Sequence, residues 1–159
     1  DDFTDPSAVH VFGHLSASIV LSRDRASQGL YPVIDPLQSS SKLLTPNVVG
    51  QRHYSVARRV RETLAAYDDL SDVIAMLGME ELSKEDQLVV IRARRLERFL
   101  TQPFFVTEQF TDRSGRMVEL EEALEGCERI LADDLPDHGE GDFYMIGSLD
   151  DLANPGRRP

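Results

Sequence analysis

The sequence predicts a mainly α fold, in which a small helical domain follows the edge of an α/β domain. Apolar residues recur every three or four positions over residues 56–77, which is the stripe of a long amphipathic helix. Two further apolar stripes follow, over residues 89–100 and 120–131. Ahead of them lie one short apolar run, typical of a strand, and a long irregular connection. We therefore expect helices to dominate, preceded by a strand and its connection.

The first elements form the predicted α/β edge. Residues 17–21 are expected to form a short strand, which runs into a short helical segment closed by Gly29. We expect the apolar run from Ile19 to Leu21 to be buried, although no partner strand is evident around it. Residues 30–50 then form a long connection, and such a connection usually has a function or a covering partner.

The start of the chain carries no obvious first element. It opens on Asp1 and Asp2, without a methionine. We expect a chain cut out of something larger. A processed terminus is the alternative, and composition alone does not decide between the two.

The first two helices are expected to form an antiparallel hairpin. Gly78 supplies a natural stop for the first helix. Ser83 and Asp86 resemble a capping box at the start of the second, and the intervening turn is short. The apolar stripe of the first helix consists of Val56, Val60, Leu64, Tyr67, Leu70, Ile74 and Leu77. That of the second consists of Val89, Ala93, Leu96 and Leu100.

The remaining elements follow Pro103, which ends the second helix. Gly115 lies between the pairs Phe110-Thr111 and Met117-Val118, which suggests a small β-hairpin. Residues 133–142 form an acidic loop, residues 143–146 an apolar run and residues 154–159 a frayed tail. The apolar face of the third helix consists of Leu120, Ala123, Leu124, Cys127, Ile130 and Leu131.

Composition and charge restrict the class of protein. The chain is 41% hydrophobic and 28% charged, as in soluble globular proteins, and no apolar run is long enough for direct membrane insertion. The net charge is −11, which argues against a nucleic-acid partner, because such binding draws on clustered Lys and Arg. Residues 119–142 hold ten carboxylates, whereas the second helix is rich in arginine. We expect solvated helix faces, with a partner surface as the alternative.

Few residues suggest chemistry by spacing alone. The sequence contains no Walker-type phosphate loop and no nucleophile elbow. His10 and His14 are four residues apart, but no third ligand lies beside them, so we predict no metal site. Cys127 is the single cysteine and is expected to be a small core residue.

One segment nevertheless carries a specific resemblance. Residues 78–86 spell GMEELSKED and resemble the "GMDELSEED" segment of the F-type ATP synthase beta-subunit family. Four more segments resemble that family in the same order: residues 30–37 (LYPVIDPL), 46–50 (PNVVG), 98–104 (RFLTQPF) and 143–147 (FYMIG). The opening "DD" and "TDP" of residues 1–6 also fit, so the resemblance covers nearly the whole chain.

The resemblance implies a domain organisation. Residues 1–48 would be the C-terminal edge of an α/β P-loop nucleotide-binding domain, ending in an edge of its parallel sheet. Residues 49–154 would be the C-terminal helical-bundle domain with its small β-hairpin, and residues 155–159 a tail. The catalytic residues of the family lie upstream of Asp1, so none is expected here. The fragment alone is expected to be inactive.

The resemblance also implies which residues face the nucleotide. Tyr31, Pro32, Phe104, Thr107 and Phe110 match the adenine pocket of the family. ATP or ADP with magnesium would bind the full-length subunit, and no cofactor is expected to bind the fragment tightly. Judged from the residues alone, ordinary core aromatics would be the favoured interpretation, and only the resemblance favours the pocket.

The remaining implications concern partners. An acidic loop would contact the central rotor, the gamma subunit, and non-catalytic alpha subunits would be the other protein partners. The complex would lie at the cytoplasmic face of a bacterial inner membrane. Lys84 departs from the family pattern, as in a divergent, sodium-coupled form. The predicted rotor-contact residues are Glu80, Glu81, Leu82, Ser83, Lys84, Glu85 and Asp86.

Three alternatives stay open at this point. The loop could be simply a solvated, capped helix start. The chain could be the helical part of a related hexameric ATPase of the flagellar export or termination-factor type. It could also be a stand-alone acidic helical interaction domain.

Overall fold

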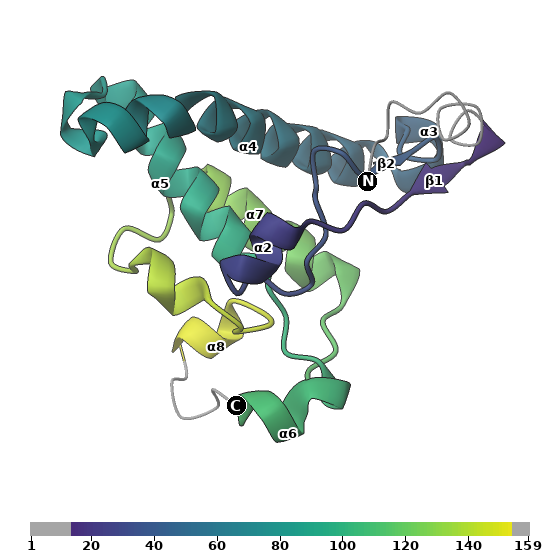
Figure 1. Cartoon of the computed structure of the whole chain (residues 1–159). Helices are drawn as coiled ribbons and strands as arrows, with labels where there is room; N and C mark the ends of the chain where they lie inside the picture. The colour runs from purple at the N-terminus through teal and green to yellow at the C-terminus, as the bar shows by residue number, and fades with distance from the viewer. Residues whose placement is uncertain (1–13, 154–159) are drawn as a thin grey trace.

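The computed structural model describes residues 14–153, apart from the side chains of Phe110, Thr111 and Ala153, and is mainly helical (Figure 1). The predicted fold class is confirmed: helices are accompanied by one small pair of antiparallel strands. The opening residues, His10 and the predicted tail lie outside the described residues. The elements are β1 (Ala17–Ser18), α2 (Arg23–Ser27), β2 (Ser40–Ser41), α3 (Pro46–Val49), α4 (Gln51–Leu77), η1 (Met79–Glu81), α5 (Lys84–Phe99), η2 (Phe105–Thr107), α6 (Glu108–Thr111), α7 (Leu120–Leu131), η3 (Glu140–Phe143) and α8 (Asp150–Ala153).

Helices α4 and α5 form the predicted hairpin, and their turn projects away from α7 and α8 (Figure 1). Gly78 ends α4 with φ of 86°, a conformation that glycine adopts without strain. Ser83 caps α5 as predicted, because its Oγ accepts a hydrogen bond of 3.1 Å from the Asp86 amide. The same hydroxyl donates to the Asp86 carboxylate at 2.7 Å. The start of α5 is therefore fixed by its own side chains.

The core lies where α4, α5 and α7 meet, and the segment after α7 closes it. Burying each large apolar side chain contributes roughly 1.5–3 kcal/mol, so this layer supplies most of the stabilisation. Only the first half of the α4 stripe takes part, since Leu77 is exposed at the tip. The core residues include Val56, Val60, Leu64, Ala93, Leu96, Phe99, Leu124, Cys127, Ile130, Phe143 and Ile146.

Besides Leu77, two more residues of the predicted apolar faces are exposed. Leu100 and Leu120 are 41% and 54% exposed. Phe99 is buried instead of Leu100, because its ring lies against Gly126 of α7. A Cβ at Gly126 would come within 2.0 Å of the Phe99 ring, so the missing side chain makes room for the aromatic.

Strands β1 and β2 pair antiparallel, with Ala17 opposite Ser41. The predicted strand is therefore shorter than 17–21, and its pairing with β2 is antiparallel; the expected edge of a parallel sheet stays a prediction. Ile19 and Leu21 are 72% and 67% exposed, contrary to the expectation of burial. Among the described residues the pair has no third strand, and two strands alone provide no layer that could bury these side chains.

The β-hairpin predicted around Gly115 is also wrong. Residues 108–111 form the short helix α6, and residues 113–119 are irregular. Gly115 instead lies against the backbone of Phe105, and a Cβ there would come within 2.3 Å of the Phe105 nitrogen. The glycine therefore permits a close approach of two chain segments and not a turn between strands.

Part of the uneven charge is paired within the chain. Arg92 donates to Asp133 at 2.9 Å, and this contact holds the pKa of the Asp133 carboxyl below its usual range. Arg95 donates to the carbonyl of His138 at 2.7 Å, and Arg94 lies 3.8 Å from Glu140. The expectation of solvated faces is therefore wrong here: the basic face of α5 packs on the acidic loop.

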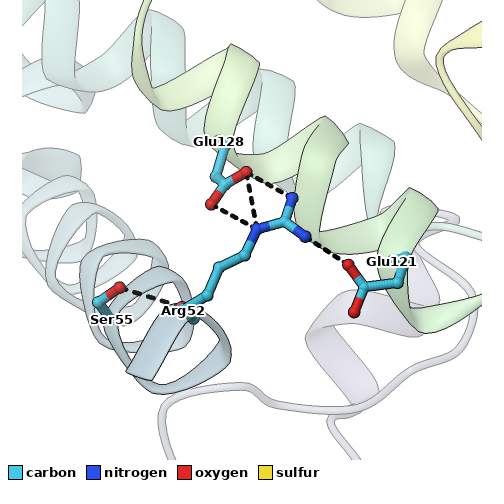
Figure 2. A network of polar contacts seen from close by, with 4 residues as sticks. All are labelled: Arg52, Ser55, Glu121 and Glu128. Atoms are coloured by element: carbon cyan, nitrogen blue, oxygen red, sulfur yellow. Dashed lines mark hydrogen bonds and ion pairs between the residues drawn. The ribbon is translucent and has the colours of Figure 1, made fainter. Parts of the chain in front are cut away.

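A second charged cluster joins the beginning of α4 to α7 (Figure 2). The Arg52 guanidinium donates to both oxygens of Glu128, with distances of 3.0 and 2.7 Å, and also pairs with Glu121. Donation from Arg52 lowers the pKa of Glu128. The backbone carbonyl of Arg52 accepts from Ser55 at 3.0 Å, so both ends of this residue are held.

Two other predictions concern the interior and the membrane. Cys127 is a buried core residue, as expected, and burial raises the pKa of its thiol to about 12. Among the described residues, none of the helices has both the length and the apolar character that crossing a bilayer requires.

Candidate functional site

A cavity of about 390 Å³ lies beside β1, but none of the predicted site residues line it. A smaller, predominantly apolar cavity of about 290 Å³ brings together three of them, Tyr31, Phe104 and Thr107. Pro32 follows Tyr31 but is not among the lining residues. Phe110 lies on α6, and its side chain is outside the described part of the structure. The complete lining is Tyr31, Gln102, Pro103, Phe104, Thr107, Arg113 and Met145.

Tyr31 reaches the cavity because the chain around it is fastened to the helical domain. The Gln102 amide donates to the Tyr31 carbonyl at 2.9 Å. Two residues earlier, the Gly29 carbonyl accepts from the Tyr144 hydroxyl at 2.8 Å. Gly29 has φ of 73°, which turns the chain out of α2 towards the cavity. Tyr31 remains 45% exposed, so part of it is accessible to a ligand.

Two further contacts hold this N-terminal segment in place. Arg61 of α4 donates to the carbonyls of Leu37 and Ser39 at 2.9 and 2.8 Å. Arg25 of α2 forms an ion pair of 3.0 Å with Glu97 of α5. Burial raises the pKa of Glu97, although Arg25 opposes the shift. The position of Tyr31 relative to α5 is therefore set by contacts along the whole segment.

The opposite wall is the loop that follows α5. Its backbone is fastened where Arg116 donates to the Pro103 carbonyl at 3.1 Å. The Gln102 side chain donates in return to the Arg116 carbonyl at 2.5 Å. Thr107 donates to the Phe104 carbonyl at 3.0 Å, so its hydroxyl is used within the loop. These hydrogen bonds hold in place the loop segment that carries Phe104.

Met145 and Arg113 complete the cavity and were not predicted. Met145 has φ of 58°, and its amide donates to the buried Thr101 hydroxyl at 2.9 Å. The Arg113 guanidinium carbon lies 5.4 Å from the centre of the Tyr144 ring. The apolar run over residues 143–146 signalled burial of Met145 but not its place in a cavity. Nothing in the sequence pattern signalled Arg113.

The cavity suits a flat apolar ring. Tyr31 and Phe104 approach it from two different parts of the chain, and an aromatic face contributes about 1–3 kcal/mol to binding a nucleobase. No carboxylate lines it, and among the described residues no cluster of three or more side chains could hold a metal ion.

The second predicted site is the hairpin tip. Its exposed residues include Glu80, Glu81 and Lys84, whereas Leu82 and Asp86 are half-buried. The Gln87 side chain donates to the carbonyls of Met79 and Leu82 at 3.2 and 3.0 Å, which fixes the turn from inside. Met76 and Leu77 are 76% and 65% exposed beside it. The tip is therefore a turn with a fixed backbone that exposes both acidic and apolar side chains.

The structure thus defines a helical-hairpin domain that shares an aromatic cavity with the segment preceding it. Residues 43–133 match the C-terminal domain of V and A type ATP synthase, and residues 1–41 match the nucleotide-binding domain of the ATP synthase alpha/beta family. The chain belongs to this ATP synthase family and corresponds to the C-terminal portion of a beta subunit.

Relatives and solved structures agree with this assignment. The chain is 65% identical over 159 residues to ATP synthase subunit beta 2 of Albidiferax ferrireducens, and 68% identical over 158 residues to subunit beta 1 of a Marinomonas species. These matches cover 100% and 99% of the chain but only 31% and 32% of the relatives, so the chain spans about a third of their length.

The similar solved structures include the ATP synthase subunit NeqB of Nanoarcheaum equitans, with a TM-score of 0.69 and 26% identity, covering 84% of this chain and 31% of that one. The type III secretion ATPase EscN of enteropathogenic E. coli has a TM-score of 0.63 at 22% identity, covering 82% and 29%. The second likeness shows a shared fold alone.

Proposed function

We propose that this segment supplies the base end of the catalytic nucleotide site in a full-length beta subunit, and that the α4–α5 tip contacts the rotor. The observation that carries the proposal is the cavity between Tyr31 and Phe104. It joins the two regions that match the nucleotide-binding and C-terminal domains. A nucleobase bound in this cavity would contact both regions.

The arrangement supports a mechanical link between the two sites. Helix α5 begins at the tip with Lys84 and ends a few residues before Phe104. Its 16 residues form one continuous rod, about 24 Å long at 1.5 Å per residue. A nucleotide that contacts Tyr31 and Phe104 in the full-length subunit would therefore move the segment around Tyr31, α5 and the tip together, as in domain closure around a ligand.

The proposal also covers the ligands, the protein partners and the activity of the full-length subunit. ATP and ADP are the proposed ligands. The non-catalytic alpha subunits and the central gamma subunit are the proposed protein partners, and ATP turnover coupled to ion transport is the proposed activity. The complex would be peripheral to the cytoplasmic face of a bacterial membrane. The segment alone is proposed to be inactive, because its sequence has no Walker-type loop to hold phosphates.

Magnesium belongs to the proposed reaction, but the described residues do not fit it. The cavity contains no carboxylate, and no cluster of potential ligands occurs elsewhere in residues 14–153. We derive no step through the metal from this segment, whose contribution is to bind and orient the base.

The decisive variant is Phe104→Ala in the full-length subunit, assembled in its complex. Loss of one aromatic wall is expected to weaken ATP binding about tenfold, since base stacking contributes about 1–3 kcal/mol. Phe105→Ala is the matched control, because Phe105 is the adjacent residue, is 64% exposed and does not line the cavity. Calorimetric titration with ATP gives both dissociation constants. Equal affinities for the two variants would refute the pocket.

A further inference from the structure

We propose that Arg116 is a positioning residue of the pocket, whose side chain anchors the wall that carries Phe104 to the segment around Asp151. The inference rests on the proposed function, since it requires that the cavity holds the base of ATP or ADP. Arg116 does not line the cavity, so its role is to fix other residues and not to touch the ligand.

The backbone of Arg116 is bound to the cavity wall in both directions. Its amide donates to the Pro103 carbonyl at 3.1 Å, and its carbonyl accepts from the Gln102 side chain at 2.5 Å. Gln102 and Pro103 both line the cavity and directly precede Phe104. A displacement of Arg116 would therefore displace the residues beside Phe104.

The side chain of Arg116 is anchored in the interior of the domain. Its guanidinium donates to the carboxylate of Asp151 and, at 3.2 Å, to the hydroxyl of Ser148. Asp151 and Ser148 are only 1% and 3% exposed. In the described part of the chain no other cation pairs with Asp151, and its second carboxylate oxygen has no hydrogen-bond partner. A buried carboxylate is costly without its counter-ion, so Asp151 holds the guanidinium in place.

The chain around this anchor leaves room for the arginine. Gly147 has φ of 81°, and a Cβ added there would come within 2.6 Å of the Arg116 Cδ. The same segment reaches the cavity at Met145, whose amide donates to the Thr101 hydroxyl at 2.9 Å. This segment therefore fastens the cavity wall at two points, at Thr101 before Phe104 and at Arg116 after it.

Fastening on both sides orders the wall before the base arrives. Ordering a loop or a side chain during binding lowers the affinity, whereas a wall that is already fixed does not incur that loss. The base takes no part in the reaction at the phosphates. Losing the anchor is therefore expected to weaken ATP binding more than it slows turnover.

The test variant is Arg116→Met in the full-length subunit assembled in its complex. Calorimetric titration is expected to show a dissociation constant for ATP raised about fivefold, the effect of having to order one or two side chains on binding. Hydrolysis at saturating ATP is expected to keep kcat within about twofold, because a loss of uniform binding leaves it unchanged. Arg116→Lys keeps the charge beside Asp151 and should recover part of the affinity.

Arg92→Met is the matched control. Arg92 pairs with Asp133 and is exposed to a similar extent as Arg116, 31% against 28%. Neither Arg92 nor Asp133 lines the cavity. This variant removes an Arg–Asp pair from the same domain, so it accounts for any general loss of stability, and its affinity for ATP is expected to be unchanged.

The outcomes separate the two proposals. If Phe104→Ala weakens ATP binding but Arg116→Met does not, or if Arg116→Met and Arg92→Met weaken it equally, this inference is wrong although the pocket stands. A fall in kcat as large as the loss of affinity would also contradict the inference. If Phe104→Ala leaves binding unchanged as well, the pocket itself is wrong. Should Arg116→Met fail to assemble, Arg116→Met combined with Asp151→Asn leaves no unpaired buried charge, and the same weakening is expected.

Discussion

At the scale of single residues, the absence of a side chain decides how α5 and α7 pack. Gly126 lies in the interior of α7, where alanine would normally be favoured by about 1 kcal/mol. A Cβ added at position 126 would however come within 2.0 Å of the Phe99 ring, which is itself buried. The two helices approach closely because residue 126 has no side chain.

Gly126→Ala is therefore expected to destabilise the fold by about 1–3 kcal/mol, the usual cost of overpacking a core. Urea denaturation followed by circular dichroism measures the change. Gly141→Ala is the matched control, because a Cβ there meets nothing within 4 Å. Replacing Phe99 by Leu in the Gly126→Ala background should recover part of the loss. Equal stability of the Gly126 and Gly141 variants would contradict this account of the packing.

At the scale of elements, helix ends were predictable and the use of loop glycines was not. Gly78 and Ser83 mark helix boundaries by local chemistry, so their roles can be inferred from the sequence. Gly115 has the same local appearance as a turn glycine, but its role comes from contact with Phe105, which only the folded chain reveals. The exposure of Ile19 likewise depends on which layers cover the strand pair.

The candidate site shows the same division. Tyr31, Phe104 and Thr107 were predicted through the family resemblance, and the structure places them around one cavity; their role in binding a base stays a prediction. Arg113 and Met145 join them because residues 101–116 and 144–145 fold against each other, which no local pattern encodes. The domain boundary predicted after residue 48 also stays a prediction.

The hairpin tip is an element whose shape, in our proposal, matters more than its charge. Neutralising Glu80, Glu81, Glu85 and Asp86 together is expected to leave ATP hydrolysis by the whole complex nearly intact, because a surface that pushes on a rotor needs its shape more than specific charges. Gln87→Ala is the contrasting variant, because it removes the amide that fixes the turn through Met79 and Leu82. It should impair coupled ATP synthesis more than neutralisation does. A collapse of hydrolysis on neutralisation would contradict the proposal.

At the scale of the whole molecule, one helix connects the two proposed sites. The N-terminal segment is fastened to the helical domain through Arg25, Arg61 and Tyr144, so Tyr31 moves with its neighbours. Helix α5 carries the tip at one end and leads to Phe104 at the other. Because this helix is continuous, binding of a base in the cavity would change the position of the tip.

Hydrogen–deuterium exchange of the assembled full-length subunit, with and without ATP, tests this account most directly. We expect ATP to protect the amides of residues 29–31 and 101–107, which line or adjoin the cavity, and to change exchange at residues 79–84 of the tip. The Phe104→Ala variant should lose both effects together. Undiminished binding of ATP with no change in exchange around Tyr31 and Phe104 would contradict the central claim.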